Sequence, residues 1–150
     1  MTTQKTIDDF FAQPNFAIAG VSRDSIKFGN IIYRALRKKG IKVFAVNPNT
    51  DSIEGDKCYH TIIDLPSETK ALIIVTPASQ TASILKDARE KGIKHIWIQQ
   101  KCESKEALVF ADKMDPVPIY GYCLFMFMKP FTFPHNMHRF FFKMSKKYPH

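Results

Sequence analysis

Short apolar runs alternate with amphipathic segments along this chain. Residues 71–75 (Ala-Leu-Ile-Ile-Val) are apolar throughout, too short for a helix, and typical of a strand buried on both faces of a parallel sheet. Similar runs predict strands at residues 16–19, 42–47, 58–59, 95–99 and 118–122. After the first strand, apolar side chains recur at helical spacing, at positions 28, 31, 32, 35 and 36, and Gly40 ends the pattern. Further helices are expected near residues 6–11, 78–91 and 104–114.

This alternation of strands and helices predicts βαβ units with right-handed crossovers and one parallel sheet. We expect an α/β fold: a Rossmann-like, doubly wound parallel sheet of five to six strands, in the order 3-2-1-4-5(-6), with a three-layer α/β/α arrangement. No internal repeat or linker interrupts the 150 residues. A single domain is therefore expected over residues 1–150, with residues 123–150 as a basic, aromatic, helical C-terminal extension.

The C-terminal extension begins with an apolar run of soft and aromatic side chains at residues 123–128. Beyond Pro134, four apolar side chains recur at helical spacing, at positions 137, 140, 141 and 144. An amphipathic helix of this kind could cover one end of the sheet, form a homodimer contact, or touch a membrane surface. His135 and His138 have the spacing of a metal site, but no acidic residue lies near them, so ordinary histidines are expected.

The formal net charge of +8 fits a polyanionic partner without choosing among nucleic acids, acidic membranes and phosphorylated cofactors. Five of the basic residues lie in the last 22 positions, which contain no acidic residue, so a general basic face for nucleic acid is not expected. No apolar run approaches the roughly 20 residues of a membrane-spanning helix. Three cysteines without a CxxC spacing favour a reducing, cytoplasmic location.

The predicted topology places a ligand site at the carboxyl ends of the strands, where the strand order reverses. The loops available there are residues 20–23, 47–49, 76–78 and 99–102. The first of these loops lacks the GxGxxG pattern of dinucleotide-binding proteins, and the second strand ends in Asn47-Pro48 without the usual acidic residue. No P-loop or nucleophile elbow is present either. Arg23 and Lys27 flank the first turn and can pair with a phosphate.

Several short motifs in the expected loops resemble those of the small single-domain CoA-binding proteins, which are relatives of the CoA-binding domain of the succinyl-CoA synthetase α-subunit. The matching motifs are Ile18-Ala19-Gly20-Val21-Ser22-Arg23, Lys27-Phe28-Gly29, Val46-Asn47-Pro48, Ile53-x-Gly55, Asp64-Leu65-Pro66, Thr76-Pro77-Ala78 and Ile96-Trp97-Ile98-Gln99. They occur in the family's order and spacing, over about residues 10–114.

The resemblance implies bound coenzyme A, with its ADP part at the first turn and beside Asn47-Pro48, and its pantetheine arm along Thr76-Pro77 and Gln99. The expected cofactor-binding residues are Gly20, Val21, Ser22, Arg23, Lys27, Phe28, Gly29, Asn47, Pro48, Thr76, Pro77 and Gln99. No catalytic residue and no metal ligand is expected. Two stretches depart from the family pattern. Asn49-Thr50 stands where many relatives carry lysine or glycine, and Gln100-Lys101-Cys102 stands where they often carry glycine.

Three functions remain open from the sequence. The first is a non-catalytic module, carrier or sensor that binds CoA or acyl-CoA. The second is an NAD(P)- or CoA-dependent enzyme that needs a partner subunit for its missing catalytic groups. The third is an interaction protein whose basic aromatic tail, from Pro134 onward, binds acidic surfaces. The first is preferred, because no nucleophile–base pair accompanies the loop motifs.

Overall fold

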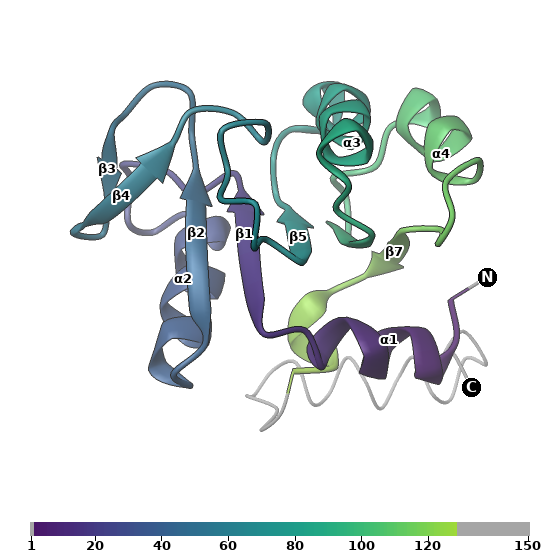
Figure 1. Cartoon of the computed structure of the whole chain (residues 1–150), viewed down its shortest axis with the longest axis horizontal. Helices are drawn as coiled ribbons and strands as arrows, with labels where there is room; N and C mark the ends of the chain where they lie inside the picture. The colour runs from purple at the N-terminus through teal and green to yellow at the C-terminus, as the bar shows by residue number, and fades with distance from the viewer. Residues whose placement is uncertain (1, 129–150) are drawn as a thin grey trace.

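The computed structural model describes residues 2–128, which form a seven-stranded sheet between two layers of helices (Figure 1). The strands are β1 (Asn15–Ala19), β2 (Lys42–Val46), β3 (Ser52–Ile53), β4 (Asp56–Tyr59), β5 (Ala71–Ile74), β6 (His95–Gln99) and β7 (Ile119–Tyr122). The helices are α1 (Gln4–Phe11), α2 (Phe28–Lys38), α3 (Ala78–Lys91) and α4 (Lys105–Ala111), followed by the short 3-10 helix η1 (Leu124–Met126). The tail residues 129–150, with His135, His138 and the expected amphipathic helix, lie outside the described residues.

The strand order is β3-β4-β2-β1-β5-β6-β7, and every neighbouring pair is parallel except β3 and β4. The expected Rossmann-like fold is therefore confirmed, and the six expected strands occur in the expected order. The expected number of strands is too low by one, because residues 52–59 form a hairpin instead of an irregular segment and one short strand. Glu54 and Gly55 both adopt positive φ, 54° and 80°, which is the geometry of a tight two-residue hairpin turn.

Alternate side chains of each strand enter the two halves of the core, as the period of two in a strand requires. From β1, Phe16 and Ile18 pack with the apolar faces of α1 and α2, whereas Ala17 and Ala19 pack with those of α3 and α4. All six residues from 123 to 128 are buried in the half of the core that contains α1 and α2. This part of the expected extension thus belongs to the domain core.

The carboxyl ends of β1 and β2 point to the top of Figure 1, and α1 lies across the bottom, at the opposite end of the sheet. The connections between parallel strands change from one face of the sheet to the other at the boundary between β1 and β5. These two strands are neighbours in the sheet although three strands separate them in sequence. This is the expected reversal of strand order, and the loops after β1, β2, β5 and β6 all meet there. None of the helices formed by residues 2–128 has the length and apolar character that crossing a bilayer requires.

Candidate functional site

A cavity of about 920 Å³ opens at the carboxyl ends of the parallel strands, at the upper end of the range of ~300–1,000 Å³ found for ligand pockets. Its walls include ten of the twelve expected cofactor-binding residues, namely Gly20, Val21, Ser22, Lys27, Phe28, Gly29, Asn47, Pro48, Thr76 and Pro77. The structure thus brings together expected residues from the loops after β1, β2 and β5. Arg23 and Gln99 do not line this cavity.

Two glycines bring the backbone of the first turn into direct contact with its neighbours. Gly20 has φ +108°, and a Cβ added there would lie 2.7 Å from the carbonyl carbon of Val75. A Cβ added at Gly29, in the first turn of α2, would lie 2.3 Å from the carbonyl oxygen of Gly20. Both obstacles are backbone atoms, which cannot rotate away. The beginning of α2 therefore sits directly against the turn after β1, and a side chain at Gly29 would separate them. A side chain at Gly20 would instead separate the turn from the backbone of Val75, which directly follows β5.

The buried side chain of Asn30 fixes the turn from inside α2. Its Oδ1 accepts from the backbone N–H of Ser22 at 2.8 Å, and its Nδ2 donates to the carbonyl of Ser22 at 2.7 Å and to Oε1 of Glu54 at 3.0 Å. Glu54 in turn accepts from Arg34 at 2.7 Å. This chain of contacts joins the β3–β4 hairpin to the ligand loop. Sequence reasoning missed Asn30 and Glu54; a polar, poorly helix-forming residue just after the Lys-Phe-Gly motif was the available signal.

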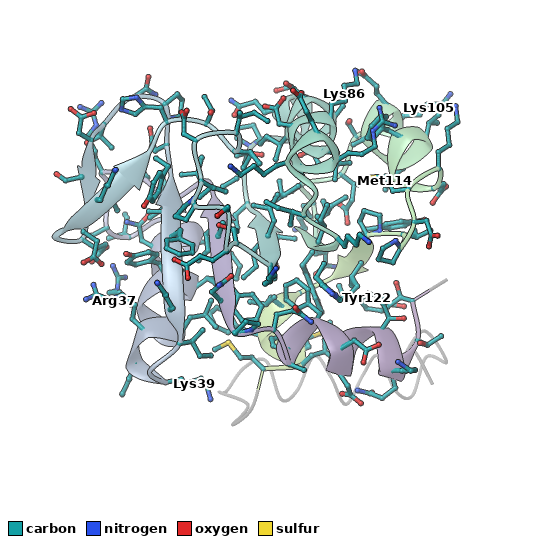
Figure 2. All side chains as sticks on the ribbon, in the orientation of Figure 1. Arg37, Lys39, Lys86, Lys105, Met114 and Tyr122 are labelled. Atoms are coloured by element: carbon teal, nitrogen blue, oxygen red, sulfur yellow. The ribbon has the colours of Figure 1, made fainter. Side chains whose placement is uncertain are left out.

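The hairpin is held against α2 by a second set of polar contacts. Arg37, labelled in Figure 2, forms an ion pair with Asp56 at 2.9 Å, and Asp56 also accepts from the hydroxyl of Tyr33 at 2.5 Å. Burial and the neighbouring Asp56 carboxylate both raise the pKa of Tyr33. The tyrosine therefore stays protonated and remains a donor. These contacts hold the β3–β4 hairpin in a fixed position against α2.

The two helices that begin at the cavity lack side-chain caps. The N-cap residues of α2 and α3 are Lys27 and Pro77, and neither makes a capping hydrogen bond with a described residue. By contrast, Thr3 caps α1 and Ser104 caps α4 through their hydroxyl groups. The first N–H groups of α2 and α3 are thus without partners among residues 2–128, and they carry the positive end of each helix dipole. Such helix beginnings bind phosphates and carboxylates.

The charged groups on the cavity wall favour an anion. Lys27 and Lys101 provide two cations, and His60, whose Nε2 lies 2.7 Å from Oδ1 of Asp51, lies on the wall near the end of β4. Asp87 on α3 is the acidic side chain among the cavity-lining residues that the structure describes. Arg23 is exposed on the loop that precedes α2. Within residues 2–128, no group of three or more His, Cys, Asp or Glu side chains is placed to hold a metal ion.

Two side chains on the cavity wall, Thr76 and Cys102, have distinct environments. Thr76 lines the cavity, and its buried hydroxyl makes no hydrogen bond to any described residue. Cys102 also lines the cavity; burial, with a smaller effect of Glu103, raises the pKa of its thiol. The cysteine is therefore a neutral thiol at physiological pH, which is a poor nucleophile. These environments suit binding better than covalent chemistry.

Two of the expected ligand contacts use their side chains within the protein. Asn47 donates to the carbonyl of Val21 at 2.8 Å and accepts from the N–H of Asn49 at 2.8 Å, so it ties the loop after β2 to the turn after β1. The carboxamide of Gln99 is buried and accepts from the N–H of Leu124 at 3.0 Å. Gln99 thus secures the segment that follows β7. Its predicted contact with the pantetheine arm stays a prediction.

The doubly wound sheet and its anion-favouring cavity define a nucleotide-type binding domain, and comparison with known proteins identifies which one. The chain belongs to the CoA binding domain family, whose model matches residues 14–128. The match confirms the resemblance found in the sequence and extends it beyond residue 114, through β7 and η1. A solved conserved hypothetical protein from Pyrococcus furiosus has 37% sequence identity and a TM-score of 0.69, and the alignment covers 73% of this chain and 95% of that one.

The curated relatives are much longer proteins. ADP-forming acetate–CoA ligase II from Archaeoglobus fulgidus is 38% identical over 100 residues, which are 65% of this chain and 15% of the ligase. The alpha subunit of ADP-forming acetate–CoA ligase II from Pyrococcus furiosus is 30% identical over 118 residues, which are 71% of this chain and 26% of the subunit. The chain therefore spans between a seventh and about a quarter of these relatives. It is homologous to their CoA-binding part.

Proposed function

We propose that this protein binds coenzyme A or an acyl-CoA in the cavity and acts as a non-catalytic module, carrier or sensor. The observation that carries the proposal is the pair of uncapped helix beginnings, α2 and α3, that face one cavity at the reversal point of the sheet. Coenzyme A has a diphosphate and a further phosphate, which such N–H groups can satisfy. Membership in the CoA binding domain family supports the choice of this ligand over other nucleotides.

The residues present fit such a ligand. The N–H groups of Phe28 and Gly29, with the Lys27 ammonium, would hold phosphate oxygens. The loop at Asn47 and Pro48 would face the adenosine part, because it lies beside the first turn. The free hydroxyl of Thr76 would then donate to or accept from the pantetheine arm, whose amides offer both kinds of group.

Calorimetric titration of the purified protein with CoA tests this proposal. We expect a dissociation constant below the millimolar range, and we expect Lys27→Met to weaken binding about tenfold, because it removes one charge-assisted contact. The matched control is Lys39→Met, which removes the same charge from the opposite end of α2 (Figure 2) and should bind CoA within twofold of the unchanged protein. Absence of binding at millimolar CoA would reject the proposal.

A further inference from the structure

Lys101 has a backbone conformation that usually belongs to glycine. Its φ is +73°, in the left-handed region, where a side chain costs free energy that glycine avoids. The other non-glycine residue in this region among residues 2–128 is Glu54, whose carboxylate has partners in Asn30 and Arg34. Residues held in such strained conformations cluster at active sites and ligand clamps.

The surroundings of Lys101 point to a ligand as its partner. The residue follows β6, lines the cavity, and makes no ion pair with any residue between 2 and 128. Its loop is tied to α3, because the hydroxyl of Thr81 donates to the carbonyl of Cys102 at 2.6 Å. Since β6 pairs with β5, and α3 begins directly after β5, Lys101 and the uncapped beginning of α3 line the same end of the cavity.

We propose that Lys101 is a specificity-determining residue that contacts an anionic group of the bound ligand at the β5–β6 end of the cavity. The anionic group is either a phosphate of the nucleotide or a carboxylate carried by the acyl group of an acyl-CoA. Lys27 lies at the beginning of α2, and Lys101 lies near the beginning of α3. The cavity therefore has two positions where a helix beginning and a lysine can hold an anion together. This inference rests on the proposed function, because it assumes that CoA or an acyl-CoA occupies the cavity.

The test compares the unchanged protein with Lys101→Met and Lys101→Gly by calorimetric titration. Both variants should bind the relevant ligand about tenfold more weakly, because each loses one charge-assisted contact. The melting temperature of Lys101→Gly should stay level or rise, since glycine relieves the strained backbone. A loss of affinity without a loss of stability separates ligand contact from a structural role. Lys105→Met is the matched control: it removes an exposed lysine from α4, outside the cavity (Figure 2), and should bind normally.

Four ligands identify the anionic group: CoA, 3′-dephospho-CoA, acetyl-CoA and succinyl-CoA. A loss for all four indicates the diphosphate. A loss for every ligand except 3′-dephospho-CoA indicates the 3′-phosphate, and a loss confined to succinyl-CoA indicates an acyl carboxylate. The inference is overturned if the unchanged protein binds CoA but Lys101→Met binds all four ligands within twofold of it. If the unchanged protein binds none of them, the proposed function itself fails.

Discussion

Replacement of Gly29 by alanine should both destabilise the fold and damage the ligand site. The added Cβ would lie 2.3 Å from the carbonyl oxygen of Gly20, about 1.1 Å inside the shortest ordinary contact of 3.4 Å, with the Gly20 carbonyl carbon at 2.9 Å and the N–H nitrogen of Val21 at 3.2 Å. All three neighbours are backbone atoms, so α2 itself must move. Overpacking of this kind costs ~1–3 kcal/mol, and the stiff surroundings favour the upper end.

The same substitution improves helix propensity, because alanine is favoured over glycine in a helix by ~1 kcal/mol. The net loss of unfolding free energy should therefore be about 2 kcal/mol, which corresponds to a fall in melting temperature of about 4–8 °C for a chain of this size. Urea denaturation and a thermal melt measure these changes. CoA affinity should fall as well, because the N–H groups of Phe28 and Gly29 move away from the turn.

Gly92→Ala is the matched control for this prediction. Gly92 has φ +82° and ends α3, and a Cβ added there would meet no atom within 4 Å. Its alanine variant should lose ~1–2 kcal/mol through backbone strain alone and keep its CoA affinity. A Gly29→Ala variant that is as stable as the unchanged protein and binds CoA normally would refute the argument from close packing.

Three further predictions concern the support of the site and its thiol. Asn30→Ala leaves the half-buried N–H and carbonyl of Ser22 without their partner, so it should cost ~1–3 kcal/mol by urea denaturation and weaken CoA binding. Glu54→Gln, which keeps an acceptor for Asn30, should cost under ~1 kcal/mol, and equal effects of the two substitutions would contradict the assigned contacts. Burial raises the pKa of Cys58 and Cys102 in the folded state, so the unfolded state loses these protons first, and stability should fall as pH rises above about 9; a flat profile between pH 8 and 10.5 would count against it. Cys102 should react slowly with iodoacetamide at neutral pH and still more slowly with CoA bound, and mass spectrometry of the labelled protein would reveal the opposite result.

The sequence predicted the central parallel strands β1, β5 and β6 well because each is a short run of mainly apolar residues buried on both faces, as in Ala71–Ile74. The β3–β4 hairpin was missed because its turn, Glu54-Gly55, lacks the Asn-Gly or Asp-Gly signal of such turns. Its two strands also contain mainly polar residues, and they are stabilised by contacts with α2 that are distant in sequence. Tertiary contacts of this kind leave no local pattern.

The location of the site followed from topology alone, since the reversal of strand order fixes which loops meet. The roles of individual side chains could not be predicted from topology. Asn47 and Gln99 stand at the expected strand ends, yet their amides hold neighbouring loops. The spacing of motifs predicts which residues lie near a cavity. Whether an amide or a lysine side chain contacts the ligand or another part of the protein depends on partners elsewhere in the chain. Lys101 was not among the expected site residues, and its positive φ and its place on the cavity wall distinguish it only in the structure.

The central claim is that this cavity selects coenzyme A. Native mass spectrometry tests it most directly, with the protein incubated in equal concentrations of CoA, NAD and ATP. We predict one predominant complex, whose added mass is that of CoA, and loss of most of that complex in the Lys27→Met variant. A predominant complex with NAD or ATP, or no complex at all, would contradict the proposal.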